Sequence, residues 1–440
     1  MDPVALINNL WLLIAALLVF TMTIAVGFLE VGELGEGLWP SLLKTMLISG
    51  AGLFVMALVG FNTAFAPTTL GGLIGNPVYH GALYAAFDPA TATSVWWSQS
   101  AAGNTLGAYF LFETAFATVT LALVGVVTLK KVKLRAFVLY SIPYFVLIWN
   151  LPAAWIWNPD GWLAQMGMAD FAGGLVVHGA AGAAGLAFLV QIWREERARG
   201  ATESPQTPIK ISPGWLTLAI LLLWVGWFGF NPGSVLQFNS EVPVVVLTTF
   251  LAAASAFLST YLTRFLITRV DPGPIWAVNG ILMGLIVITP VAGFVSPGSA
   301  IILGLLAGPL FIGGEILVGR QKWFSDPVGL LPGHLLGGLF GVVMIAFFTQ
   351  TGFATLSGAP GLPNGLFFGG GMAAVHQLGV ELFGIVVVMV TVFVLSLIVL
   401  AAIAQAMGGI TVGNATGAPT SAPPTPLAPG ADAAPGRTAG

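Results

Sequence analysis

Two histidines inside apolar segments are the residues best suited to chemistry in this sequence. DFAGGLVVHGAAG places His178 eight residues after Asp170, and DPVGLLPGHLLGG places His334 eight residues after Asp326. A neutral imidazole carries one hydrogen-bond donor and one acceptor, and it can pass on a proton by changing tautomer. A single buried histidine is more often a packed core residue. Two with the same surroundings indicate a pair that handles a proton or a small polar molecule.

The likeness between these segments extends beyond the histidines. Glycines follow each aspartate at the same two spacings, namely Gly182 and Gly185 in the first segment and Gly338 and Gly341 in the second. Small residues let helix backbones approach closely in membranes. The alternative is a chance match in a chain that contains 57 glycines.

The composition of the chain indicates a membrane protein. Of its 440 residues, 57% are hydrophobic and only 7% are charged, whereas soluble domains carry about 25% charged residues. The absence of cysteine excludes disulfides, thiol nucleophiles and thiolate metal sites, and four histidines with few acids do not predict a metal centre. The net charge of −3 gives no indication of nucleic acid as a partner. No nucleophile–base constellation appears in the apolar interior, so we expect neither an enzyme nor a cofactor.

A membrane-spanning helix needs about 20 mostly apolar residues. Pro and Gly within such runs are compatible with membrane helices, where neighbouring groups satisfy the exposed backbone. We therefore predict an all-α polytopic membrane protein with eleven transmembrane helices, at residues 8–30, 41–66, 104–128, 134–157, 168–192, 214–233, 242–267, 274–294, 299–318, 327–350 and 379–408.

The basic residues predict the orientation of these helices. If every run crosses the membrane once, all 14 Lys and Arg residues, from Lys44 to Arg437, fall on the same side of the membrane. The positive-inside rule makes that side cytoplasmic, so we expect the N-terminus outside, the C-terminus inside, and a multi-pass protein of the cell inner (plasma) membrane. The long connections 67–103 and 351–378 then lie outside, with His80 and His376 in or beside them as surface residues.

The two histidine segments lie five helices apart, which predicts two halves of opposite orientation, as in the inverted repeats of transport proteins. The predicted transmembrane domain covers residues 1–408, with one repeat at 8–192, a second at 214–350 and a last helix at 379–408. In this arrangement the two histidines face each other near the midplane. Residues 409–440, rich in Pro, Ala, Gly and Thr, are predicted to form a disordered cytoplasmic tail.

The scarcity of polar groups limits the substrate. Sugars and amino acids need many polar contacts and charged anchors, which this interior lacks. Water, ammonia, ammonium and carbon dioxide remain as candidates. Ionisable groups at membrane depth usually mark a pathway or a relay, so a histidine pair suits a molecule that can give up or accept a proton.

Several motifs resemble those of the ammonium transporter (Amt/Mep/Rh) family. DFAGGLVVHGAAGAAGL (170–186) closely resembles the family signature, FETAFATVTLALVG (112–125) its third helix and WVGWFGFNPGS (224–234) its sixth. WNPDGWLAQMG (157–167) resembles the external approach to the fifth helix, and QLGVELFG (377–384) the start of the eleventh. The likeness runs from about residue 45 to 408. It implies the same eleven helices, external N-terminus and inverted halves, and a homotrimer with one pore per subunit.

The resemblance also implies roles for individual residues. His178 and His334 match the twin histidines of the pore. Phe116 and Trp157 match an aromatic site that recruits ammonium, with Ser234 as a hydroxyl partner and Asp170 below the external vestibule. Two further aromatic residues complete the match, with Phe230 facing Phe116 as stacked rings that close the pore and Trp227 on the pore wall.

Each of these roles has a structural alternative. Asp170 can cap the start of its helix, and Trp157 can be an interfacial belt residue. Phe116 and Phe230 can be packing residues, and Ser234 can bond its own helix.

The chain departs from the family pattern at several positions. Glu113 and Glu381 stand where glutamine is usual, where they either strengthen the cation field or bond a neighbour. Glu30, Glu33 and Glu36 make the corner after the first run acidic, and Gly329 stands where some members have a second aspartate. The tail lacks the charged regulatory segment of many bacterial members, which argues against control by a cytoplasmic signalling protein bound to it.

The resemblance favours a transporter or channel for ammonium and ammonia, with methylammonium as an analogue and the lipid bilayer as its environment. In this mechanism ammonium is recruited outside and deprotonated, and ammonia crosses between the histidines. Two alternatives remain at this point. One is an ammonium sensor (transceptor) on the same fold, and the other is an Rh-like channel for ammonia or carbon dioxide, which would have a weaker aromatic cation site.

Overall fold

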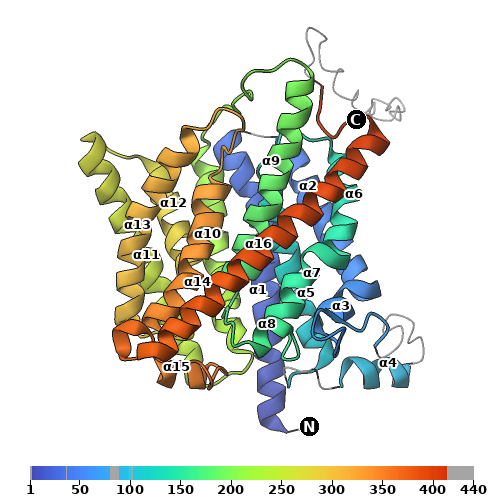
Figure 1. Cartoon of the computed structure of the whole chain (residues 1–440), viewed down its shortest axis with the longest axis vertical. Helices are drawn as coiled ribbons and strands as arrows, with labels where there is room; N and C mark the ends of the chain where they lie inside the picture. Colours follow the sequence, from blue (N-terminus) through green and yellow to red (C-terminus); the bar gives the residue numbers. More distant parts are fainter. Residues whose placement is uncertain (1, 36, 80–88, 99, 101–102, 414–440) are drawn as a thin grey trace, which may run out of the picture.

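The computed structural model describes residues 2–35, 37–79, 89–98, 100 and 103–413, and it is almost entirely helical (Figure 1). The long helices are α1 (Pro3–Leu34), α2 (Leu38–Val55), α5 (Leu106–Gly125), α6 (Leu134–Pro143), α9 (Ala180–Ala198), α10 (Pro213–Phe230), α11 (Glu241–Thr268), α12 (Pro274–Ile288), α13 (Pro297–Gly319), α14 (Leu336–Phe348) and α16 (Gly371–Met407).

Shorter elements extend or connect these helices. They are η1 (Met56–Gly60), α3 (Phe61–Phe65), α4 (Pro89–Trp96), η3 (Tyr144–Ile148), α7 (Asn150–Ile156), α8 (Trp162–Gln165), η4 (Gly174–Gly179), η5 (Pro232–Val235), η6 (Leu330–Leu335), α15 (Thr351–Leu356) and η7 (Leu366–Phe368). One antiparallel hairpin is formed by β1 (Thr68–Thr69) and β2 (Ile74–Gly75), with Thr68 opposite Gly75.

Within the described residues, ten helical segments are long and apolar enough to cross a membrane. They coincide with ten of the eleven predicted runs, including the runs built from two or three consecutive elements, such as η4 with α9 and η6 with α14. The predicted run 274–294 corresponds to α12, which has only 15 residues and ends at Ile288. Residues 289–294 turn there instead of continuing the helix, and the Pro290 carbonyl accepts a hydrogen bond from the Phe171 N–H at 3.0 Å. The multi-pass helical architecture is therefore confirmed, and the count of eleven stays a prediction.

Several predicted boundaries differ from the observed ones by five to eight residues, and the fifth run, predicted at 168–192, is helical over Gly174–Ala198. The first run, predicted at 8–30, is a helix over Pro3–Leu34, and the last, predicted at 379–408, begins eight residues earlier at Gly371. His376 is therefore an exposed residue on α16 rather than part of a loop. His80 lies outside the described residues.

The helices pack in two groups that meet along the histidine segments. On one side α1 packs against α5 and α10, and on the other α11 packs against α12 and α13. α16 runs obliquely across the bundle and contacts α6, α9 and α14 (Figure 1). The start of α1 and the end of α16 lie at opposite ends of the bundle, and we call these ends the N-terminal face and the C-terminal face.

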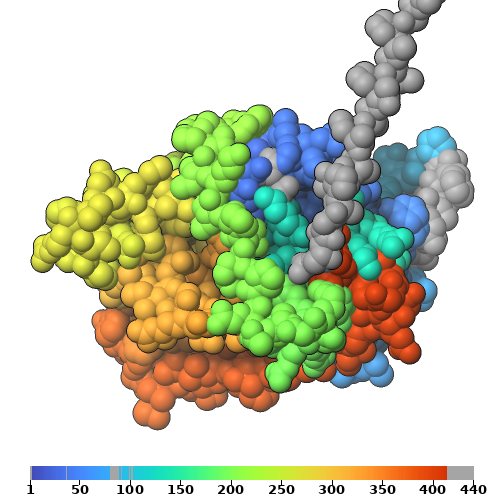
Figure 2. Space-filling model, turned by 90° about the horizontal axis from the view of Figure 1, so that it is seen from above, coloured from blue at the N-terminus to red at the C-terminus, as the bar shows by residue number. Residues whose placement is uncertain are grey.

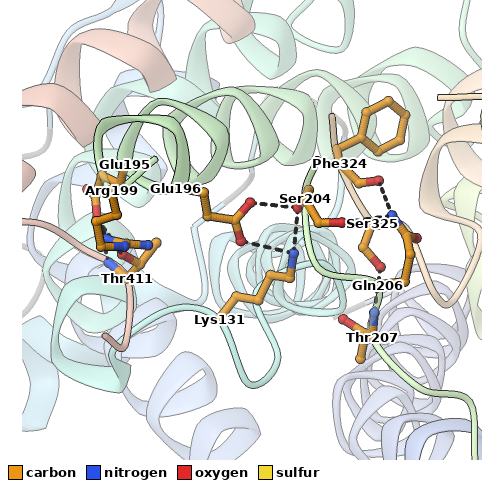
Figure 3. Close-up of polar contacts among 10 residues, drawn as sticks. All are labelled: Lys131, Glu195, Glu196, Arg199, Ser204, Gln206, Thr207, Phe324, Ser325 and Thr411. Atoms are coloured by element: carbon orange, nitrogen blue, oxygen red, sulfur yellow. Dashed lines mark hydrogen bonds and ion pairs between the residues drawn. The ribbon is translucent and has the colours of Figure 1, made fainter. Parts of the chain in front are cut away.

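Residues 409–413, predicted to belong to a disordered tail, are instead fixed to the C-terminal face. The Glu195 carboxylate near the end of α9 accepts hydrogen bonds from the Ile410 and Thr411 N–H groups at 2.8 and 2.9 Å and from the Thr411 hydroxyl at 2.6 Å. Arg199 also donates to Thr411 at 2.9 Å (Figure 3). The composition of this stretch did not indicate these bonds, because they are made by its backbone to a distant helix. The rest of the predicted tail, 414–440, lies outside the described residues.

A second polar cluster holds the connection between α9 and α10 to the same face. Lys131 Nζ contacts Glu196 at 3.2 Å and Ser204 at 2.8 Å, and Ser204 donates to Glu196 at 2.6 Å (Figure 3). Burial lowers the pKa of Lys131, and the Glu196 carboxylate opposes this shift. In Figure 2 the green segment after α9 crosses the middle of this face, between the blue and teal helices and the yellow and orange ones.

Candidate functional site

The two histidines meet in the interior of the bundle. His334 Nδ1 lies 3.1 Å from His178 Nδ1, so one ring donates its N–H and the other accepts it. Both side chains are buried. The His178 ring lies nearly parallel to those of Trp227 and Phe230, with centroids 5.9 Å away in each case and interplanar angles of 20° and 12°. His178 Nε2 has no protein hydrogen-bond partner within the described residues, so it is the ring nitrogen that is left for a substrate.

The same sequence of local structures brings each histidine to this position. An aspartate accepts backbone N–H groups, a glycine three residues later adopts positive φ, and a π-helix begins at the next residue with the histidine in its fifth position. Gly173 has φ +108° before η4, and Gly329 has φ +74° before η6. Left-handed backbone of this kind favours glycine, which has no Cβ to clash.

The two aspartates cap these π-helices. Asp170 accepts four backbone N–H groups, those of Gly173, Gly174, Leu175 and Val176, at 2.6–3.1 Å. Asp326 accepts the N–H groups of Leu330 and Leu331 at 2.9 and 2.7 Å. Burial raises the pKa of Asp326 to about 6, although the backbone N–H groups favour its charged form. Asp170 therefore has the geometry of a helix cap, which was the structural alternative considered for it.

Two of the matched glycines allow the histidine segments to approach. A Cβ added to Gly338 would lie 2.9 Å from His178 Cβ, and one added to Gly182 would lie 2.5 Å from Leu335 Cβ. Each glycine thus packs against the other histidine segment. The spacing seen in the sequence corresponds to a reciprocal contact between the two segments.

On the side of the N-terminal face, an aromatic cavity of about 80 Å³ lies beyond the ring of Phe230. It is lined by Tyr109, Phe112, Glu113, Phe116, Trp157, Phe171, Ser234 and Leu236. Phe116, Trp157 and Ser234, predicted to act together, are therefore brought together. Asp170 is not part of this lining, but its backbone carbonyl accepts a hydrogen bond from Trp157 Nε1 at 2.8 Å and so holds the indole in place.

The rings beside this cavity are not stacked as predicted. Phe116 and Phe230 have centroids 4.4 Å apart but are inclined by 42°, and Trp157 meets Phe116 edge-on at 5.5 Å and 86°. Aromatic pairs avoid a face-to-face sandwich because their quadrupoles repel in that arrangement. Ser234 donates its hydroxyl proton to the Phe230 carbonyl at 2.8 Å, so one of the alternatives for Ser234, a bond to its own helix, is present. Ser234 is nevertheless among the residues that line the cavity.

On the other side of Phe230 lies a narrow apolar cavity of about 10 Å³. Its lining consists of the two histidines and a ring of apolar side chains, namely Met22, Val26, Leu29, Val119, Leu123, Leu223, Trp227, Phe230 and Leu282. Trp227 lies on this wall, as predicted, and its Nε1 donates to Thr289 Oγ1 at 3.1 Å. The described residues contain no group of three or more His, Asp or Glu side chains arranged to hold a metal ion.

Sequence reasoning did not place Glu113 in the site, although it singled the residue out as a departure from the family. Glu113 lies one turn before Phe116 on α5, and its carboxylate is among the groups that line the aromatic cavity. The i, i+3 spacing of these two residues was the available signal. Glu381, by contrast, is a structural residue, because it accepts from the Ala169 N–H at 3.0 Å and from Gln377 at 2.7 Å.

These features define a helical membrane protein in which a cavity with aromatic walls leads, past two phenyl rings, to a buried histidine pair. A profile of the Ammonium Transporter Family matches residues 10–418. The chain belongs to the Ammonium Transporter Family.

Relatives and solved structures agree with this assignment. The chain is 29% identical over 366 residues to an ammonium transporter of Bacillus subtilis, with 82% of this chain and 84% of that protein covered. It is 30% identical over 362 residues to an ammonium transporter of Aquifex aeolicus, with 81% and 80% covered. Mep2 of Saccharomyces cerevisiae shares the fold with a TM-score of 0.77 at 24% identity, covering 92% of this chain and 87% of that one. A structure titled Sensor Amt Protein has a TM-score of 0.77 at 25% identity, covering 93% and 95%.

Proposed function

We propose that this chain carries ammonium nitrogen across a membrane, by binding ammonium in the aromatic cavity and passing ammonia between His178 and His334. The observation that carries this proposal is the 3.1 Å contact between the two imidazoles in an apolar cavity directly beyond the aromatic one. Membership of the Ammonium Transporter Family supports the substrate.

The chemistry of the cavity suits a small cation with several N–H donors. The faces of Trp157 and Phe116 attract a cation by about 0.5–2 kcal/mol each, depending on how far it is desolvated. The Ser234 oxygen can accept one N–H of ammonium. These groups bind without surrounding the ion completely, which leaves it able to release a proton.

Past the rings, the apolar lining favours a neutral molecule. A full charge in such surroundings is far more costly than a hydrogen-bonded neutral group. Ammonia fits this requirement, and His178 Nε2 can hydrogen-bond it. Potassium has no proton to lose, so the same lining excludes it.

The family resemblance extends the proposal to the arrangement of the whole protein. We expect the two histidine segments to belong to inverted halves, the N-terminal face to be external, and the chain to form homotrimers in the cell inner (plasma) membrane. The reciprocal contacts of Gly182 and Gly338 support the inverted halves.

Purified protein in proteoliposomes tests the proposal. An inward ammonium gradient should give uptake, and His178→Ala with His334→Ala should reduce that uptake or abolish its selectivity over potassium. His376→Ala is the matched control, because this histidine is exposed on α16, and it should behave as the parent. If the parent protein gives neither uptake nor binding of ammonium or methylammonium, the proposal fails.

A sensor is the second candidate, and the likeness to the structure titled Sensor Amt Protein favours it. The same experiment separates the two functions. Saturable ammonium binding without measurable uptake would identify a sensor, whereas sustained uptake identifies a transporter.

A further inference from the structure

Glu113 presents a carboxylate oxygen that no described protein group satisfies, and it does so at the wall of the aromatic cavity. The side chain is 4% exposed, and its Oε2 lacks a hydrogen-bond partner. The Tyr109 phenol, one turn earlier on α5, is in hydrogen-bonding contact with the same carboxyl group. Both residues line the cavity together with Phe116, Trp157 and Ser234.

A buried carboxylate without a full set of partners is costly unless it takes up a proton or a cation joins it. The other groups of this cavity do not supply that cation, because the lining contains aromatic rings, one leucine and the hydroxyls of Ser234 and Tyr109 but neither Lys nor Arg. The same rings offer a cation their negative faces. All of the polar features of the lining therefore favour one small positive ion.

We propose that Glu113 is the anionic ligand of ammonium in the aromatic cavity, so that the site recruits the charged species rather than ammonia or carbon dioxide. This inference rests on the proposed transport of ammonium and specifies how the substrate is chosen. One N–H of ammonium donates to Glu113 Oε2, another donates to Ser234 Oγ, and the faces of Phe116 and Trp157 cover the remaining charge.

The other buried carboxylates near this end of the bundle do not line the aromatic cavity, which leaves this role to Glu113. Both carboxylate oxygens of Asp170 accept hydrogen bonds, from four backbone N–H groups in all. Glu381 accepts bonds from the Ala169 N–H and from Gln377 at Oε1, and its Oε2 has no partner, but Glu381 lies on α16 outside the lining of this cavity, with Asp170 as its neighbouring titratable group. Tyr109 is the titratable side chain in contact with Glu113.

The proposal has a consequence for pH dependence that a packing role would not produce. A proton and an ammonium ion compete for the same carboxylate oxygen. The KM for ammonium should therefore rise as the external pH falls from about 8 to about 5, while the maximal rate changes little. Glutamine at this position cannot be protonated, so it should remove the pH dependence of KM.

The test measures ammonium uptake by proteoliposomes over this pH range for the parent protein, Glu113→Gln and Glu113→Asp. Loss of a charge-assisted hydrogen bond should raise the KM of Glu113→Gln by about 10- to 100-fold at pH 7 and flatten its pH profile. Glu113→Asp keeps the charge and should retain the pH dependence with an intermediate KM. Glu241→Gln is the matched control, because Glu241 is also buried with both carboxylate oxygens unpartnered but lies on α11 outside the cavity.

An unchanged KM in Glu113→Gln, or a pH profile like that of the parent, would overturn the inference while leaving ammonium transport intact. If Glu113→Gln does not fold, as judged by size exclusion, the parent protein alone decides, because a KM that is constant from pH 8 to 5 would also overturn it. Absence of uptake by the parent protein would instead count against the proposed function.

Discussion

Asp170 shows how one residue can support a site without lining it. Its two oxygens accept four buried backbone N–H groups at the start of η4, the π-helix that carries His178. An asparagine offers one acceptor oxygen in place of two, and it carries no charge to favour the helix N-terminus. Because an unsatisfied buried N–H costs about 1–3 kcal/mol, we expect Asp170→Asn to destabilise the protein by at least about 2 kcal/mol.

Thermal unfolding in detergent measures this effect, and the chain offers two comparisons. Asp326→Asn should cost less, since Asp326 accepts two backbone N–H groups, and Asp160→Asn should change little, since Asp160 is exposed. If Asp170→Asn unfolds like the parent but binds ammonium more weakly, Asp170 is a direct ligand and the capping argument is wrong.

The sequence predicted the histidine pair, because two imidazoles at equal spacing from two aspartates are rare signals in a chain with four histidines. It did not predict that Glu113 would face the aromatic cavity. The i, i+3 spacing places Glu113 on the same side of α5 as Phe116, but the sequence does not show which side of that helix meets a cavity. The side of α5 that meets the cavity is determined by how α1, α2 and α9 pack against it.

At the scale of elements, the π-helices η4 and η6 are the feature that sequence patterns did not reveal. Their apolar composition predicts a membrane helix, but it does not indicate the wider turn or the positive-φ glycine that precedes each of them. The reciprocal glycine contacts were better predicted, because the +12 spacing in both segments indicated close approach. Gly338 packs on His178 and the Gly174 carbonyl, so both histidine segments are in contact at this point.

We therefore expect Gly338→Ala to push η4 and α14 apart and to separate the imidazoles. Overpacking of this kind typically costs about 1–3 kcal/mol, and ammonium uptake should fall even where the protein remains folded. Uptake assays and thermal unfolding provide the two readouts. Gly313→Ala on α13 is the control, since a Cβ there meets no atom within 4 Å. Equal uptake by Gly338→Ala and Gly313→Ala would mean that the close approach is not needed for transport.

At the scale of the molecule, the C-terminal face is held together by residues that lie far apart in the chain. Residues 409–412 join the end of α16 to α9 through Glu195. They also join it to the segment before α6. There the Val412 N–H donates to the Lys131 carbonyl at 2.9 Å, and the Lys133 N–H donates to the Ile410 carbonyl at 2.9 Å. The oblique α16 is thus attached at its far end to α9, which directly follows η4, the π-helix that carries His178. The composition of 409–440 predicted a tail along its whole length, but the chain remains bonded to the bundle through these residues.

A chain that ends at Met407 should therefore be less stable than one that ends at Gly413, because it loses the three bonds to Glu195. Charge-assisted hydrogen bonds contribute about 1.5–3 kcal/mol each when buried and less when they are partly exposed, so we expect a loss of about 2 kcal/mol in all.

Glu195→Ala in the full chain should reproduce most of this loss, since it removes the common acceptor. Glu203→Ala is its control, because Glu203 forms an exposed ion pair with Lys322 at 2.9 Å and such pairs contribute little. Thermal unfolding of the four proteins decides the matter: if the chains ending at 407 and 413 unfold at the same temperature, residues 409–412 rest on this face without stabilising it.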